Sequence, residues 1–249
     1  MNILKVIPTL MLVLIPQLVI ADFAGIYLGG GGWLKSAGGT VAYTNADYAN
    51  LASDLKLNLS IDTYYYLTIE HPVPLIPNYR YFHTDNKNSG SGSISSTYNF
   101  GGVAFETGSS VSTSLDISST SHILYYELLD NYVSFDVGLA FIQMDGKFSA
   151  QETGNGNNSV NFPINTLIPS AYVSAGVTIP YINMSLVYEQ TLLKLGSSEI
   201  SDVAYKFTFE DGLIGYESAI RTQTVKLDVS SIKSEMVFGG MYVGMYIHF

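Results

Sequence analysis

Two histidine–aspartate combinations are the side chains of this sequence that could support acid–base catalysis. His83 and Asp85 are two positions apart, which places them on one face of a strand, and His122 follows Asp116 by six positions. A general base needs a partner that orients it and a reacting group within reach. The spacing indicates neither, and no Ser/His/Asn grouping of the kind that lipid hydrolases use can be placed. We therefore predict no catalytic residues.

Metal and cofactor chemistry finds little support either. The chain has 4 His and no Cys, and the histidines lack the spacing of metal ligands. The glycine run 29–32 could be taken for a phosphate-binding loop, but neither a Lys-Ser/Thr pair nor a helical pattern follows it. The formal charge of −10 argues against nucleic acid, which needs a basic surface. We expect no cofactor, no metal and no nucleic-acid partner.

A second set of candidates consists of charged residues on the polar face of alternating segments: Arg80, Asp136, Glu189, Lys206, Glu217 and Arg221. Segment 131–143 shows the alternation most clearly, with apolar odd-numbered residues from Val133 to Phe141 and small or polar even-numbered residues between them. Period-two alternation predicts strands with one apolar face. The charged residues are thus expected on the opposite face of a sheet.

The overall composition decides how such a sheet is built. Hydrophobic residues make up 47% of the chain and charged residues 13%, yet past residue 21 there is no apolar run of about 18 residues. The hydrophobicity must therefore be distributed by alternation. Within lipid only helices and closed barrels satisfy every backbone polar group. The sequence predicts an all-β fold, a transmembrane antiparallel up-and-down β-barrel, with apolar residues toward lipid and the charged set toward the lumen.

The two ends of the sequence indicate where the barrel resides. Lys5 followed by an apolar stretch and Ala21 predicts a signal peptide at 1–21, which leaves a barrel domain at 22–249. Removal of Lys5, with no acidic residue, changes the formal charge from −10 to −11. The last strand carries Tyr242, Gly244, Ile247 and Phe249, a pattern that resembles the C-terminal assembly signal of bacterial outer-membrane β-barrels.

The expected topology has ten strands, with eight as the alternative. Long polar connections are predicted at 36–54, 86–112, 145–166, 194–201 and 226–235, and short turns at 72–77, 129–131, 179–181 and 210–212. Long outer loops and short periplasmic turns are typical of outer-membrane barrels. The first strand is expected at 23–34, and the cluster Tyr64–Tyr66 at a membrane-interface girdle. In segment 113–128 the apolar residues change parity, which predicts a bulge near His122.

Ten strands should leave a narrow lumen. Glu189, Lys206, Glu217 and Arg221 come from neighbouring strands and can form one charge network. Buried charges need partners, so these residues are expected to neutralise one another and fill the lumen. A small polar conduit or ligand pocket, a binding surface on the outer loops, and a barrel hydrolase with a His/Asp site at the outer rim are the alternatives.

Several motifs together carry a family resemblance. The stretch Glu70–Asn78 reads Glu-His-Pro-x-Pro-x-x-Pro-Asn, Tyr125–Asn131 reads Tyr-Tyr-Glu-x-Leu-Asp-Asn, and Gly215–Glu217 and a terminal His-Phe follow. The chain resembles a group of uncharacterised proteobacterial outer-membrane β-barrel proteins. The resemblance implies a Gram-negative outer-membrane protein and no reaction. The expected partners are outer-membrane lipid, lipopolysaccharide, the barrel-assembly machinery and periplasmic chaperones, with a monomeric, porin-like barrel.

Overall fold

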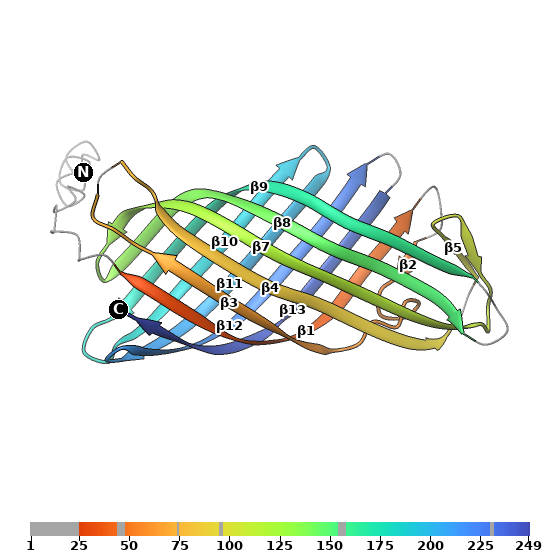
Figure 1. Ribbon diagram of the computed structural model, residues 1–249, viewed down its shortest axis with the longest axis horizontal. Coiled ribbons are helices and arrows are strands. Elements are labelled where there is room, and N and C mark those ends of the chain that lie inside the picture. The colour runs from red at the N-terminus through yellow and green to blue at the C-terminus, as the bar shows by residue number, and fades with distance from the viewer. Residues whose placement is uncertain (1–24, 44–47, 74, 95–96, 154–157, 230–231) are drawn as a thin grey trace, which may run out of the picture.

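The computed structural model describes residues 25–43, 48–73, 75–94, 97–153, 158–229 and 232–249, and it is all-β. Ten long antiparallel strands form a closed barrel in the order β1-β3-β4-β7-β8-β9-β10-β11-β12-β13, and β13 pairs with β1 (Figure 1). The prediction of a ten-stranded barrel is confirmed, and the alternative of eight strands is wrong. The predicted signal peptide at 1–21 and the start of the predicted first strand lie outside the described residues.

The barrel strands are β1 (Ile26–Tyr43), β3 (Ser60–Ile69), β4 (Asn78–Ser93), β7 (Ser110–Asp130), β8 (Val133–Thr153), β9 (Ser159–Ile179), β10 (Met184–Leu195), β11 (Ser198–Asp211), β12 (Ile214–Val229) and β13 (Ile232–His248). Three short strands belong to the connections: β2 (Ala49–Asn50), which pairs with β1, and β5 (Tyr98–Phe100) and β6 (Val103–Phe105), which form a hairpin. In the described residues, no helix is long and apolar enough to span a membrane.

The seam between the first and last strands closes the barrel. β1 and β13 pair from Tyr27↔His248 to Tyr43↔Ile232 without a break in register. Ile26 and Phe249 also exchange backbone hydrogen bonds of 3.1 and 3.0 Å. Because the ladder has no free edge at this seam, the terminal strand completes the backbone hydrogen bonding that a lipid environment requires.

Alternation sorts the side chains between the outside and the lumen as predicted. On β8, Leu139 is exposed on the outer wall whereas Ala140 is fully buried inside. The same sorting makes an apolar outer belt whose large exposed members include Leu28, Leu34, Tyr65, Leu124, Leu139, Leu167, Leu186, Tyr205, Phe207, Ile220, Met241, Val243 and Ile247. Such a belt around a closed antiparallel sheet is the lipid-facing surface of a transmembrane barrel.

The two ends of the barrel differ. At one end the strands are joined at 70–77, 131–132, 180–183 and 212–213, close to the predicted turns. At the other end the prediction of long loops is confirmed only for two connections, 44–59 and 94–109. For the other three it is wrong, because β8, β9, β10, β11, β12 and β13 continue through most of the predicted loop residues and leave only 154–158, 196–197 and 230–231 between barrel strands. Strand pairing is made by the backbone, so Ser-, Thr- and Gly-rich segments extend the ladder beyond the lipid-facing belt without any apolar outer face.

The predicted bulge near His122 is also wrong. β7 pairs in unbroken register with β4 throughout and with β8 from Ser110 to Glu127, and the β7–β8 register shifts between Glu127 and Leu129. Leu115 and Ile117 are each 3% exposed and point into the barrel. The change of parity in the sequence therefore reflects a change in the barrel interior, which is polar at mid-height and apolar toward the outer end.

The tyrosine cluster is divided between the two faces. Tyr65 is exposed on the outer wall as expected of a girdle residue, but Tyr64 and Tyr66 are buried in the lumen. Gly29 makes this possible, because a Cβ at that position would lie 2.5 Å from the Tyr66 ring. The glycine run of β1 thus provides space for lumen tyrosines.

Candidate functional site: a charged plug below an apolar chamber

A buried cluster of three charges crosses the lumen at mid-height. The Arg80 guanidinium of β4 lies 2.5 Å from the Glu189 carboxylate of β10, and the Lys206 ammonium of β11 lies 2.7 Å from the same oxygen. β4 and β10 are separated by β7, β8 and β9 in the sheet order. The Arg80–Glu189 contact therefore spans the inside of the barrel rather than linking adjacent strands.

A second ion pair lies beside the first. Arg221 of β12 donates to both carboxylate oxygens of Asp202 on β11, with its Nη2 2.6 Å from Oδ2 and its Nε 3.0 Å from Oδ1. Its Nη1 reaches across the lumen to the Thr84 hydroxyl at 3.3 Å. The guanidinium also lies 4.5 Å from the Trp33 ring centroid and 5.0 Å from that of Phe82. Fork-like pairing and stacking on aromatic faces suit arginine rather than lysine.

Glu217 of β12 is held by tyrosine hydroxyls. Tyr64 donates to it at 2.7 Å and Tyr66 at 3.3 Å, both from β3. Tyr242 packs against Tyr64 with ring centroids 4.7 Å apart. We call the whole set the plug: Tyr64, Tyr66, Arg80, Glu189, Asp202, Lys206, Glu217 and Arg221. A cavity of about 50 Å³ remains between these groups, which is room for a few water molecules and no larger solute.

The structure brings together five of the six charged residues expected in the lumen: Arg80, Glu189, Lys206, Glu217 and Arg221. Asp136 faces the lumen but stands apart, next to Ser174 in the β8–β9 ladder, and among the described residues no cation lies within 4 Å of it. The sequence analysis did not include Asp202. Asp202 lies four residues before Lys206 on β11 and therefore on the same inward face, so the alternation could have identified it.

A further buried pair was missed because the first strand was expected to end too early. Lys35 is fully buried and its Nζ lies 2.5 Å from Asp62 Oδ2. The same nitrogen donates to Ser60 Oγ at 2.9 Å and to Asn88 Oδ1 at 2.8 Å. Continuing the alternation of β1 two positions beyond Trp33 would have placed Lys35 inside.

Above the plug the interior opens into an apolar cavity of about 360 Å³, which we call the chamber. Most of its lining consists of inward residues of the barrel strands, which include Leu115, Ile117, Ile142, Met144, Phe148, Phe162, Ile164, Ile200, Val225, Met236 and Phe238. Leu51, Leu55 and Leu57, from the connection between β1 and β3, are buried and complete the lining.

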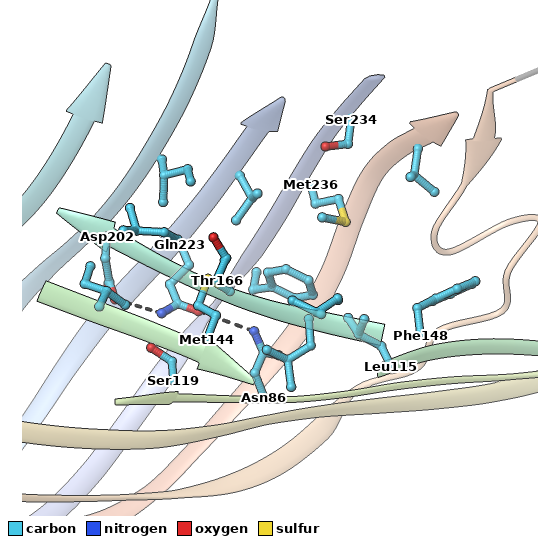
Figure 2. Close-up of a pocket in the computed structure, with 18 of the residues that line it drawn as sticks. Asn86, Leu115, Ser119, Met144, Phe148, Thr166, Asp202, Gln223, Ser234 and Met236 are labelled. Carbon is cyan, nitrogen blue, oxygen red and sulfur yellow. Dashed lines mark hydrogen bonds between the residues drawn. The ribbon is translucent and has the colours of Figure 1, made fainter. Parts of the chain in front are cut away.

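Few polar groups line the chamber, and some of them lack a hydrogen-bond partner. Figure 2 shows a chain in which Asn86 donates to Gln223 at 3.3 Å and Gln223 donates to Asp202 at 2.8 Å, which links the chamber to the plug. The side-chain amide oxygen Oδ1 of Asn86 and the hydroxyl of Ser234 are buried without a hydrogen-bond partner in the described part of the chain. A buried acceptor without a donor is unfavourable by about 1–3 kcal/mol, so these atoms favour a polar ligand group.

The histidine–aspartate candidates lie on the outer wall. His83 Nε2 and Asp85 Oδ1 are 3.9 Å apart on the outward face of β4, and His83 stacks on Tyr65. His122 Nδ1 lies 2.8 Å from the Tyr79 hydroxyl. Since β4 continues to Ser93, these residues are part of the wall and do not form the outer rim.

The residues of the predicted assembly signal are sorted between the two faces of β13. Tyr242 is buried inside, Gly244 faces inward beside the Tyr64 hydroxyl, and Ile247 and Phe249 are exposed outside. Their role in assembly stays a prediction. Among the described residues no three His, Asp or Glu side chains are grouped as a metal site.

Comparisons with known proteins give similarity at the level of structure alone. No family model and no curated protein matches the sequence. The transport unit of the autotransporter AIDA-I from Escherichia coli is 8% identical with a TM-score of 0.35 and covers 95% of this chain and 92% of its own. The toluene transporter TodX of P. putida is 7% identical with a TM-score of 0.28, over 91% and 90%. The toluene transporter TbuX of Ralstonia pickettii is 9% identical with a TM-score of 0.20, over 93% and 90%. Identities and TM-scores this low assign neither a function nor a ligand to this chain.

Proposed function

We propose that this chain is a monomeric integral outer-membrane protein that binds a small ligand from the outer side and neither conducts ions nor catalyses a reaction. The observation that carries the proposal is that the chamber lies above the plug inside the barrel. The plug fills the lumen at mid-height, and the chamber above it is large, apolar and lined by side chains of many strands. Cavities of about 300–1,000 Å³ with few polar groups are typical of small-molecule sites.

The plug supports closure of the lumen for electrostatic reasons. Glu189 neutralises two cations at once, and each of its partners is almost fully buried. Breaking such a pair leaves an uncompensated buried charge, which is unfavourable by about 3–5 kcal/mol. An ion that passed the plug would have to break these contacts, so the resting barrel is expected not to conduct.

Planar-bilayer recording of the purified chain tests the closed lumen. The wild type is expected to give no discrete current steps. The triple variant Arg80→Ala, Glu189→Ala, Lys206→Ala removes the cluster without leaving a lone charge and is expected to conduct. A control variant, Lys194→Gln with Glu199→Gln, removes an exposed pair whose atoms are 3.7 Å apart and should stay silent. Discrete wild-type steps that disappear on Glu189→Gln would replace the proposal by a narrow channel.

A further inference from the structure

The wall of the barrel is incomplete on one side of the chamber. β9 runs from Ser159 to Ile179, but its ladder with β10 ends at the pair Ala171↔Leu192. Residues 159–170 of β9 are paired with β8 on one edge, and no described strand pairs with their other edge. Figure 1 shows β9 continuing far beyond the tip of the β10–β11 hairpin. We call the space between this edge and the hairpin the gap.

The sequence of β9 keeps this edge open. Pro163 and Pro169 both lie in the stretch that β10 leaves unpaired. A proline has no backbone N–H and is confined to edge strands or bulges within a sheet. The gap is therefore encoded in the strand itself, and it does not depend on the short length of the hairpin alone.

The chamber reaches the outside through the gap. Its lining includes consecutive residues of β9 from Phe162 to Thr166, which point alternately inward and outward. It also includes Ser201, an outward residue of β11 on the opposite side. A cavity enclosed by an intact wall would be lined by residues of one parity, so this lining passes around the free edge of β9.

The gap lies at the upper boundary of the lipid-facing belt. Along β8 and β9, the paired outward residues are Leu139 and Ala171, then Phe141 and Pro169, and higher up Asp145 and Asn165. Leu167 on β9 and Leu195 at the hairpin tip are both largely exposed. An apolar entrance bordered by polar residues above it is suited to a molecule that inserts in the outer leaflet with its polar end toward water.

The chamber itself indicates the class of ligand. A cavity of about 150 Å³ holds benzene, so about 360 Å³ corresponds to about a dozen carbon atoms. The Asn86 oxygen lacks a donor, which calls for a hydroxyl or amide on the ligand. The Asp202 carboxylate in the lining disfavours a second anion.

We propose that the chamber takes up a single-chain amphiphile, a medium-length hydrocarbon with a neutral hydrogen-bond-donating head, which passes sideways through the gap between β9 and the β10–β11 hairpin. This proposal rests on the proposed ligand-binding function. The amphiphile can come from the outer leaflet or from the medium, since the chemistry of recognition is the same.

Binding is measured as energy transfer from Trp33, the chain's 1 tryptophan, to a dansylated dodecanol, with the protein in phosphatidylcholine vesicles. Unlabelled 1-dodecanol should remove the signal, whereas probe that is only dissolved in lipid is not displaced. Asn86→Leu is expected to weaken 1-dodecanol competition about fivefold and to leave competition by n-dodecane unchanged. Equal weakening for both competitors would overturn the role given to the head group.

The lateral route is tested by blocking the gap. Asn165→Cys at the gap and Ser118→Cys on the closed wall form a matched pair, because both side chains point outward and both neighbour Asp145 in the ladders. The chain has no native Cys, so a bulky maleimide modifies one site. At residue 165 it should slow uptake at least about tenfold, and at residue 118 it should leave the rate unchanged.

Supplying the probe in donor vesicles or from water separates the two sources. Slower uptake by the protein modified at residue 165, from either donor vesicles or water, supports entry through the gap. The supply from which uptake slows identifies the source of the amphiphile. Equal rates for both modified variants in both arms, with displaceable binding retained, would overturn the lateral route alone. Absence of displaceable binding in the unmodified wild type would instead overturn the ligand-binding function.

Discussion

At the scale of single residues, the plug depends on one carboxylate that serves two cations. Glu189 accepts from Arg80 across the lumen and from Lys206 on the neighbouring strand. Both cations are buried, so each needs this partner. The sequence placed all three on the inner face, but their contact depends on side chains from opposite sides of the barrel.

Glu189→Ala is expected to destabilise the barrel by about 3–5 kcal/mol, because it leaves two buried cations without a counter-charge. Equilibrium urea unfolding in detergent measures the loss. The control is Glu199→Ala in the exposed Lys194–Glu199 pair, which should change stability by less than about 1 kcal/mol. Similar stability of the two variants would show that the plug charges are hydrated.

A substitution at Gly215 tests whether the lumen tyrosines need a glycine on the neighbouring strand to make room for their rings. A Cβ at this position would overlap the ring of Tyr246, whereas at Gly239, also within a barrel strand, the nearest atom would be Thr222 Oγ1 at 3.8 Å. Gly215→Ala should therefore lower the free energy of unfolding by about 1–3 kcal/mol through overpacking, and Gly239→Ala should have little effect. The same urea titration compares them. Restoration of stability in Gly215→Ala with Tyr246→Leu would confirm the cause.

At the scale of elements, β8 shows how one strand serves two environments. Its outward residues are apolar from Val133 to Phe141 and polar from Gln143 upward, while the strand continues to Thr153. Backbone pairing carries the strand beyond the belt, and only the outer side chains mark where lipid ends.

Cysteine accessibility on β8 locates this boundary. Leu139→Cys should be protected from a membrane-impermeant maleimide in vesicles, because it faces lipid. Lys147→Cys, on the same face and four outward positions higher, should react readily. Detergent-denatured protein gives full labelling of both and serves as the reference. Rapid labelling at residue 139 in vesicles would move the membrane boundary toward the end of the barrel with the short turns.

At the scale of the whole molecule, the closed ladder makes the barrel a single cooperative unit. Its ten strands are hydrogen-bonded in one closed cycle, so no strand can unfold without breaking the ladders to both of its neighbours. The plug adds contacts across the middle of this cycle. The gap beside β9 interrupts the wall at the upper boundary of the belt, where water can reach the free backbone groups along the upper part of the edge.

This closure predicts heat-modifiable migration on a gel. Unheated protein in SDS should remain a folded barrel and migrate faster than the boiled chain. The Glu189→Ala variant should convert at a lower temperature than the wild type, because its plug is weakened. Identical migration with and without heating would contradict the closed barrel.

The sequence by itself determined the fold class, the strand number and the face of the strands with unbroken alternation, such as β8. Period-two alternation and the absence of an apolar helix-length run leave a closed barrel as the solution in lipid. It also placed Arg80, Glu189, Lys206, Glu217 and Arg221 inside, because a charge on the lipid face is unfavourable.

Only the tertiary structure decided which of these charges meet and what lies above them. Arg80 and Glu189 are separated along the sheet by three strands, so their contact follows from closure and from no local pattern. Leu115 and Ile117 could face lipid or a core, since alternation does not distinguish two apolar environments. The chamber and its gap therefore follow from strand lengths, strand edges and the side chains that converge from nine strands.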